Sequence, residues 1–317
     1  MKATTVTNKV GLVGTGMVGC SFAYALMQSG LANELVLVDL DKARAEGEAM
    51  DLNHGMAFVQ PMRIVAGDYC DLADADVIVI CAGINQHPGQ SRLDLLKTNA
   101  AIFADIVPKI IAVNRNAILI VATNPVDILT QLTATIAHGD VGRVFGAGTA
   151  LDTARLRFML GLHYEVDPHS IHAYVVGEHG DSELALWSLA NIAGVRLHDF
   201  RGANAQVFDA HALECVFLQV RGAAAQIIEK KKASYYAIGL ALVCIVEAVL
   251  RDQHTVMTVC SPFSGQYGVR DIALSMPSIV GKRGVERVLD MPLSDTELVA
   301  FHASAQTLKD SLQGIGT

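Results

Sequence analysis

Six short, uninterrupted apolar runs alternate with helical patterns in the first half of the chain. The runs lie at 10–13, 35–38, 64–66, 77–82, 118–122 and 144–145. Continuous apolar runs are typical of strands in a parallel sheet that is buried on both faces, and the segments between them are long enough for helical crossovers. The sequence therefore predicts an α/β fold with a doubly wound parallel sheet, a Rossmann fold, that binds ligands at the carboxyl ends of its strands.

A glycine-rich turn follows the first of these runs and opens a helical pattern. It reads Gly14-Thr15-Gly16-Met17-Val18-Gly19. In such a turn the first glycine permits the sharp bend, the second lets the backbone approach a pyrophosphate, and the third allows the helix to pack closely on the strand. The N–H groups at the start of the helix then face the phosphates. A dinucleotide site is therefore expected here.

Asp39 follows the turn by twenty residues and ends the second apolar run. A carboxylate at this place accepts hydrogen bonds from a ribose diol and repels a 2′-phosphate, so NAD is favoured over NADP. Arg44, five residues on, weakens that repulsion. The alternative interpretation of Asp39 is a strand-end aspartate that only starts a turn.

The pattern changes after Gly148, where we place a domain boundary between the sheet domain, 1–147, and a second α+β domain for the substrate, 148–317. A helix is expected to start near Leu151, followed by a strand at 171–176, helices at 205–225 and 232–250, and a strand pair at 255–260 and 272–280. The last helix is expected at 294–312, where Ser294 and Glu297 match a capping box.

Composition excludes several classes of protein. The formal net charge is -8, which is poorly suited to a nucleic-acid partner. The apolar segment 235–250 is 16 residues long and carries Glu247, so we expect a buried helix and no membrane association. The six cysteines contain no C-x-x-C pair, which is ordinary for a reducing compartment, and no Cys/His cluster suggests a metal. The N-terminal residues 1–9 lack a signal-peptide core, so the expected location is the cytoplasm.

Five further motifs occur in one order along nearly the whole chain. They are AGINQ at 82–86, SR at 91–92, TNPVD at 123–127, LDTAR at 151–155 and GEHGD at 177–181. With these motifs the chain resembles the L-lactate/malate dehydrogenase family, and its short N-terminus resembles the bacterial form. The resemblance implies reversible, NADH-dependent reduction of a 2-keto acid to a 2-hydroxy acid. It also places Val18, Arg44, Tyr69, Gly83 and Asn124 at the NAD site.

The reaction needs a proton donor and an anchor for the substrate carboxylate. His179 is the candidate acid and base, because an imidazole titrates near working pH. Asp152 is its expected partner, which fixes the tautomer and favours the charged imidazole. Arg155 lies three residues later on the same helix face and is expected to hold the carboxylate with two parallel hydrogen bonds. Taken alone, a structural histidine and a surface Asp–Arg pair would be the better interpretation.

The stretch 84–93 contains Pro88 and Gly89 and is expected to be a loop that closes over the substrate. The resemblance implies that Arg92 on this loop polarises the ketone and stabilises the developing oxyanion, while closure excludes water. Asn124 is expected to hydrogen-bond the substrate and the nicotinamide, in an extended conformation imposed by Pro125.

Two positions bear on the choice of substrate. Gln86 is neutral where malate dehydrogenases of the family carry an arginine, so a second carboxylate would be buried without a partner and pyruvate is favoured over oxaloacetate. Ser234 stands where lactate dehydrogenases of the family usually have threonine. The missing methyl group enlarges the pocket slightly, so longer keto acids remain an alternative.

Arg157 and His172 match positions at which bacterial members bind fructose 1,6-bisphosphate between subunits. Arg157 points away from the catalytic face of its helix, because two residues turn a helix by about 200°. The resemblance implies a homotetramer in which two copies of the pair form a cationic pocket for this effector. A structural interface pair, or a site for inorganic anions only, is the alternative.

Three functions are compared. The first is reduction of pyruvate to L-lactate, and the second is the same chemistry on malate or another L-2-hydroxy acid. The third is a catalytically silent NAD-binding protein, which the full set of Arg92, Asp152, Arg155 and His179 makes the weakest of the three.

Overall fold

The computed structural model describes residues 8–84, 92–138, 142–202 and 208–314. Its helices are α1 (Met17–Ser29), α2 (Lys42–His54), α3 (Arg92–Val113), α4 (Val126–Ala137), α5 (Ala150–Tyr164), α6 (Ala210–Lys231), α7 (Tyr236–Leu250) and α8 (Asp295–Gln313). Among the described residues no helix is both long and apolar enough to cross a membrane.

All six strands expected in the first half form, and they pair in parallel. They are β1 (Lys9–Val13), β2 (Glu34–Val38), β3 (Arg63–Ala66), β4 (Val77–Ile80), β5 (Ile118–Val121) and β6 (Val144–Gly146). Their order in the sheet is β6-β5-β4-β1-β2-β3. The order reverses between β4 and β1, so the doubly wound fold is confirmed and ligands are expected at the carboxyl ends of these two strands.

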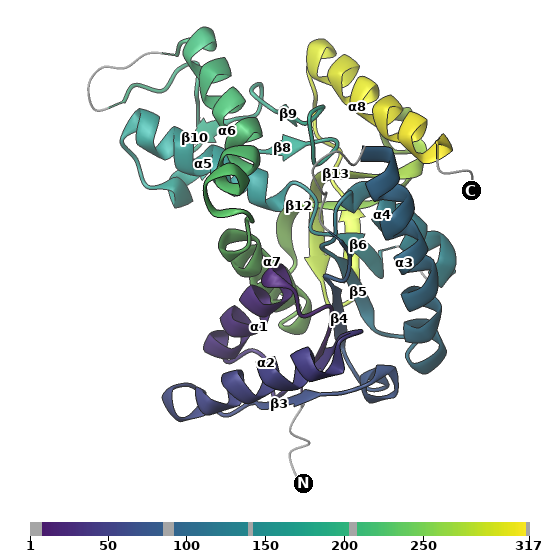
Figure 1. Cartoon of the computed structure of the whole chain (residues 1–317). Coiled ribbons are helices and arrows are strands. Elements are labelled where there is room, and N and C mark those ends of the chain that lie inside the picture. The colour runs from purple at the N-terminus through teal and green to yellow at the C-terminus, as the bar shows by residue number, and fades with distance from the viewer. Residues whose placement is uncertain (1–7, 85–91, 139–141, 203–207, 315–317) are drawn as a thin grey trace, which may run out of the picture.

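Both faces of this sheet are covered by helices, as Figure 1 shows. On one face Val10 and Leu12 of β1 belong to a core that includes Phe22 of α1 and Leu242 of α7. On the other face a second core joins the sheet to α3 and α4. Successive side chains of a strand point to opposite faces of the sheet. Because both faces are covered, apolar residues are favoured at every position of these strands.

Helix α7 lies beyond the predicted domain boundary, yet it packs on α1. A Cβ at Gly239 of α7 would lie 2.9 Å from the backbone carbon of Ser21. This close approach explains the apolar segment 235–250 as a buried helix. The boundary near 148 itself stays a prediction.

The expected strand pair is longer and has a third member. Strands β12 (Thr255–Ser264), β13 (Arg270–Gly281) and β14 (Gly284–Val288) form an antiparallel meander. Cys260 of β12 pairs with Gly146 of β6, so the meander extends the parallel sheet to nine strands. This continuation was not predicted, because strand pairing between distant segments leaves no local signal in the sequence.

Two expected boundaries are wrong in detail. The strand at 171–176 is divided into β7 (Ile171–His172) and β8 (Val175–Val176), because β7 pairs with β10 (Asn191–Ile192) and β8 pairs with β9 (Leu184–Ala185) in another sheet. Helix α6 continues to Lys231, where Lys232 takes a left-handed conformation (φ 72°) and ends it. The capping box at Ser294 and Glu297 is confirmed.

Candidate active site

The glycine turn between β1 and α1 has the shape that a bound pyrophosphate needs. Gly14 has φ 100°, and a Cβ there would lie 2.4 Å from the backbone nitrogen of Ala82. A Cβ at Gly19 would lie 2.1 Å from the carbonyl oxygen of Gly14. Gly16 is the N-cap of α1, and a Cβ there would meet no heavy atom of the described residues within 4 Å. The described residues therefore leave space at the N-terminus of α1, where the first-turn N–H groups have no partner within the helix, and Val18 of this turn is partly buried.

Asp39 lies at the carboxyl end of β2 and is tied to the glycine turn. Its Oδ2 accepts hydrogen bonds from the backbone nitrogen of Thr15 (2.6 Å) and from Thr15 Oγ1 (2.8 Å), and its Oδ1 accepts one from the nitrogen of Asp41 (3.0 Å). Partial burial disfavours its charge, but these hydrogen bonds and nearby Arg44 hold the pKa of Asp39 below its ordinary value. A carboxylate with accepting capacity left over fits a ribose diol. The contact of Thr15 with Asp39 was not predicted from the sequence.

Gly83 and Tyr69 lie near the same edge of the sheet. A Cβ at Gly83 would lie 2.4 Å from Thr123 Cγ2, so only glycine allows the ends of β4 and β5 to approach here. Tyr69 begins a short 3-10 helix (Tyr69–Leu72) under the Lys109 ammonium, 5.6 Å from its ring. Burial raises the pKa of Tyr69. The open space above Gly16, the free N–H groups of α1 and the ionised Asp39 together fit NAD.

Asn99 is a fully buried residue of α3 that the sequence analysis missed. Its Oδ1 accepts a hydrogen bond from the nitrogen of Ile84 (2.9 Å), and its Nδ2 donates to the carbonyl oxygen of Asn124 (2.8 Å). The link fixes the backbone of Asn124, whose side chain is exposed at the end of β5. The peptide bond between Asn124 and Pro125 is cis.

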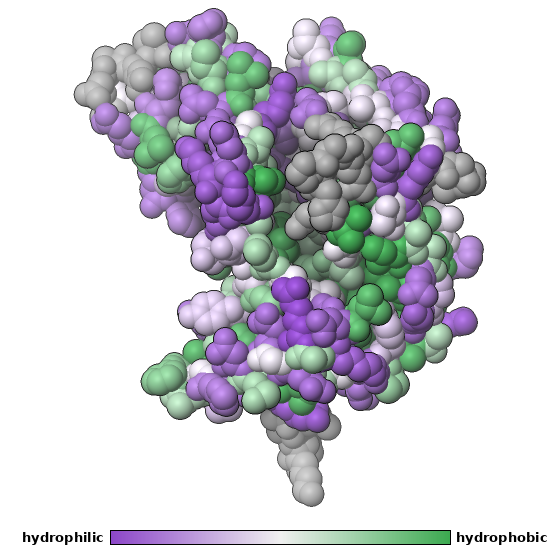
Figure 2. All heavy atoms as spheres, viewed as in Figure 1, coloured by the Kyte–Doolittle hydropathy of each residue, from purple (hydrophilic) through white to green (hydrophobic). Residues whose placement is uncertain are grey.

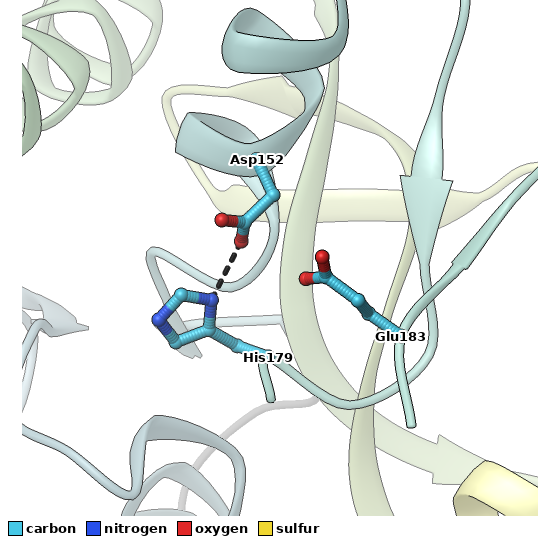
Figure 3. Close-up of side chains that lie close together, drawn as sticks. All are labelled: Asp152, His179 and Glu183. Atoms are coloured by element: carbon cyan, nitrogen blue, oxygen red, sulfur yellow. Dashed lines mark hydrogen bonds and ion pairs between the residues drawn. The ribbon is translucent and has the colours of Figure 1, made fainter. Parts of the chain in front are cut away.

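His179, Asp152 and Arg155 come together as the sequence predicts, and Figure 3 shows the first two side chains. His179 Nδ1 lies 2.6 Å from Asp152 Oδ2, and Arg155 Nη1 donates to Asp152 Oδ1 at 2.6 Å. Asp152 is buried, whereas 24% of the His179 side chain and 14% of the Arg155 side chain remain exposed. Since Nδ1 faces Asp152, the imidazole has Nε2 left for a substrate.

The electrostatics of this group favour the charged imidazole. Burial alone would lower the pKa of His179, but the negative charge of Asp152 and its hydrogen bond, with smaller contributions from the charges of Asp127 and Glu183, outweigh burial and raise that pKa to about 9. Burial disfavours ionised Asp152 as well, but the His179 and Arg155 charges keep its pKa below the ordinary value. The pair is therefore an imidazolium and a carboxylate at neutral pH.

The backbone of His179 is fixed from two sides. Gly177 takes φ 88°, where a Cβ would meet Ser304 Oγ at 2.8 Å, so this bend of the chain requires glycine. The nitrogen of His179 donates to Oδ2 of Asp127 at 2.8 Å. Asp127 lies in the first turn of α4 and in one of the sequence motifs, but its role was not predicted. Its burial raises its pKa to about 6.

Buried threonines hold the first turn of α5, which carries Asp152. Thr149 Oγ1 donates to the carbonyl oxygen of Val175 at 2.6 Å, and Thr153 Oγ1 lies 2.9 Å from Thr258 Oγ1. These bonds connect α5 to β8 and β12. They fix the position of Asp152 relative to His179, and nothing in the local sequence indicates them.

The structure describes only some of the remaining predicted site residues. Gln86 lies outside the described residues. Arg92 is the first residue of α3, and its side chain lies outside the described part of the structure. Ser234 is partly buried in the connection between α6 and α7. Figure 2 shows a hollow between the lobe of α5 and α6 and the body of the sheet.

Arg157 and His172 lie on neighbouring segments, away from His179. Arg157 Nε donates to the carbonyl oxygen of Ala173 at 3.1 Å, next to the exposed His172, and its guanidinium lies 5.4 Å from the centre of the Tyr174 ring. Burial lowers the pKa of Arg157.

Comparison with known proteins identifies the family. The lactate/malate dehydrogenase NAD-binding domain matches residues 8–146, and the α/β C-terminal domain of the same family matches residues 149–315. The chain belongs to the lactate/malate dehydrogenase family. It is an NAD-dependent oxidoreductase, and NAD(H) is its cofactor.

Relatives from bacteria resemble this dehydrogenase over nearly its whole length. It is 48% identical over 306 residues to an L-lactate dehydrogenase of Thermoanaerobacter sp. (strain X514), covering 96% of this chain and 98% of that one. It is 48% identical over 307 residues to L-lactate dehydrogenase 1 of Clostridium acetobutylicum, covering 97% and 98%. Among solved structures, the minor L-lactate dehydrogenase of Enterococcus mundtii aligns with a TM-score of 0.94 at 42% identity, over 98% of each chain.

Proposed function

We propose that this dehydrogenase catalyses the reversible, NADH-dependent reduction of pyruvate to L-lactate. The observation that carries the proposal is the contact of His179 Nδ1 with Asp152 at 2.6 Å, where Asp152 also accepts from Arg155. The relatives' names, L-lactate dehydrogenase, support the same substrate.

The chemistry is divided among few groups. Bound NADH supplies a hydride for C2 of the keto acid. His179 holds a proton on Nε2 and transfers it to the ketone oxygen, while Asp152 keeps the other ring nitrogen protonated and stabilises the imidazolium. Arg155 binds the substrate carboxylate through its guanidinium, and Arg92 stabilises the developing oxyanion. Lactate oxidation reverses these roles and starts from a neutral His179.

Substrate choice is assigned to Gln86 and Ser234. A neutral Gln86 offers no partner to the second carboxylate of oxaloacetate. Binding of oxaloacetate is therefore weakened, because it would bury an unpaired charge. Ser234 leaves room for a slightly longer keto acid, and a methylene group changes binding by only about 1–3 kcal/mol.

We also propose a homotetramer that is activated by fructose 1,6-bisphosphate and works in the cytoplasm. The support is the placement of Arg157, which donates to the backbone oxygen of Ala173, next to the exposed His172. Two such pairs across a two-fold axis would bind two phosphate groups.

The test follows NADH oxidation with pyruvate and with oxaloacetate, each with and without fructose 1,6-bisphosphate. We expect fast turnover of pyruvate and at least about a hundredfold lower kcat/KM for oxaloacetate. A lower half-saturation concentration of pyruvate in the presence of the bisphosphate supports the effector site, and no change contradicts it. Preference for oxaloacetate would overturn the role of Gln86.

A further inference from the structure

Glu183 is a buried acid beside the catalytic pair that the mechanism above does not use. It lies four residues after His179, immediately before β9, and only 4% of the residue is exposed. One ring nitrogen of His179 and one carboxylate oxygen each of Asp152 and Glu183 lie within 4.8 Å of one another. In Figure 3 the Glu183 carboxyl group points toward the other two side chains.

The surroundings of Glu183 do not neutralise it fully. Its Oε1 is buried and has no hydrogen-bond partner among the described residues. Arg221 of α6 donates to the backbone oxygen of Glu183 at 3.3 Å, and it favours the charged carboxylate only through space. Because burial disfavours the charged form, a buried carboxyl group without a hydrogen-bond partner tends to keep its proton.

The charges that face Glu183 come from several elements. Asp152 and Arg155 lie on α5, Arg221 lies on α6, and His179 lies on the same segment as Glu183. Asp127 at the start of α4 acts on His179 from the other side, with Glu178 close to Asp127. Of these, Asp152 opposes ionisation of Glu183, while His179, Arg221 and Arg155 favour it.

We propose that Glu183 is a positioning residue that sets the proton affinity of His179. While Glu183 carries its own proton, it is neutral, and only Asp152 and Asp127 stabilise the imidazolium. When Glu183 ionises, its negative charge beside the ring strengthens the hold of His179 on its proton. The site thus keeps its proton donor at a pH where Asp152 and Asp127 by themselves would not.

The raised pKa values of the two groups agree with this order of events. Burial first and the charge of Asp152 second raise the pKa of Glu183 to about 8, while the pKa of His179 lies at about 9. As the pH rises, Glu183 therefore loses its proton before His179 does. Because the two groups are coupled, the two apparent steps belong to the pair.

The experiment compares the wild-type enzyme with Glu183→Gln, which keeps the shape of the side chain and removes its charge. The pH profile of kcat/KM for pyruvate is measured, together with the rate at which diethyl pyrocarbonate, a reagent for neutral imidazole, inactivates each protein. We expect both midpoints to move to lower pH by about half to one unit in the variant, since a charge near the ring is lost. The plateau at low pH should stay within about twofold of wild type, because Glu183 is neutral there.

Two further variants make the result decisive. Glu214→Gln on the exposed side of α6 is the matched control and should leave both midpoints unchanged. Glu183→Asp, which keeps the charge, should restore most of the wild-type midpoint and gives a second test where the glutamine variant folds poorly. An unchanged midpoint in Glu183→Gln, or a uniform loss of rate at all pH values, would overturn the proposal.

This role of Glu183 rests on the proposed function. The experiment distinguishes failure of the role of Glu183 from failure of the proposed function. If the wild-type enzyme does not reduce pyruvate, the proposed function fails. If it reduces pyruvate and the inactivation midpoint does not move in Glu183→Gln, only the role of Glu183 fails.

Discussion

The imidazole of His179 and the carboxylate of Asp152 are joined through Nδ1 and Oδ2 at 2.6 Å, across 27 residues of sequence. Asp152 is buried and also accepts from Arg155, so it cannot turn to solvent without leaving a buried cation unpaired. The relationship fixes which ring nitrogen faces the substrate. Asp152 thus contacts both the proton donor, His179, and the anchor for the substrate carboxylate, Arg155.

Asp152→Asn tests this relationship. The change removes the negative charge that offsets the effect of burial on His179. The pKa of His179 should therefore fall from about 9 toward or below its ordinary value of 6.5. We expect kcat/KM for pyruvate at pH 7 to fall by about 10²–10⁴-fold, with an alkaline limb that starts at lower pH. Asp167→Asn is the control, because Asp167 makes the same kind of contact with His169 at 2.7 Å but on the exposed surface. An unchanged pH profile in Asp152→Asn would contradict the assignment.

The wild-type pH dependence should differ between the two directions. Pyruvate reduction needs the protonated form of His179, which is present below its pKa of about 9 and is lost above it. We expect kcat/KM for pyruvate to be flat near neutral pH and to fall as the pH rises through about 9, while kcat/KM for lactate rises through the same range. A midpoint near 6.5 for both directions would show that Asp152 does not stabilise the charged ring.

Arg155→Lys tests the carboxylate anchor. A lysine keeps the charge but cannot give two parallel hydrogen bonds, so the loss should appear in kcat/KM for pyruvate, by about a hundredfold or more. NADH affinity, measured by fluorescence titration, should stay within about twofold, because Arg155 is assigned to the substrate alone. Arg251→Lys, in a surface pair with Glu247, is the matched control and should behave as wild type. Equal losses in NADH and pyruvate binding would show a general structural role.

Two glycines of the same turn should respond differently to alanine. Gly16→Ala adds a Cβ to open space at an ordinary φ of -73°, so the free energy of unfolding should change by less than about 0.5 kcal/mol. The added methyl group lies where the pyrophosphate approaches, and NADH affinity should fall by about tenfold or more. Gly14→Ala places its Cβ against backbone at φ 100°, and should lower the melting temperature itself. Full NADH affinity in Gly16→Ala would place the phosphates elsewhere.

The sequence predicted the features that depend on local patterns. The six parallel strands, the bend at Gly14, the capping box of α8 and the His179–Asp152–Arg155 group all follow from apolar runs or from short motifs. Each has its signal within a few residues, or within a motif that carries its partners.

The supporting polar contacts could not be predicted in the same way. Asp127 reaches His179 over 52 residues, and Thr149 reaches Ser275 over 126 residues. A buried polar side chain shows nothing in the sequence about which distant partner it will find. The same reason explains why the pairing of β12 with β6 and the burial of Glu183 beside Asp152 were not foreseen.

The most direct test of the central claim compares wild type with His179→Asn in one assay of NADH oxidation by pyruvate, with NADH affinity measured on the same samples. We expect the wild-type enzyme to produce L-lactate, and the variant to bind NADH equally well while kcat falls by about 10³-fold or more, because the proton donor is lost and the cofactor site is intact. A variant that reduces pyruvate at close to the wild-type rate would contradict the assignment of His179 as the proton donor.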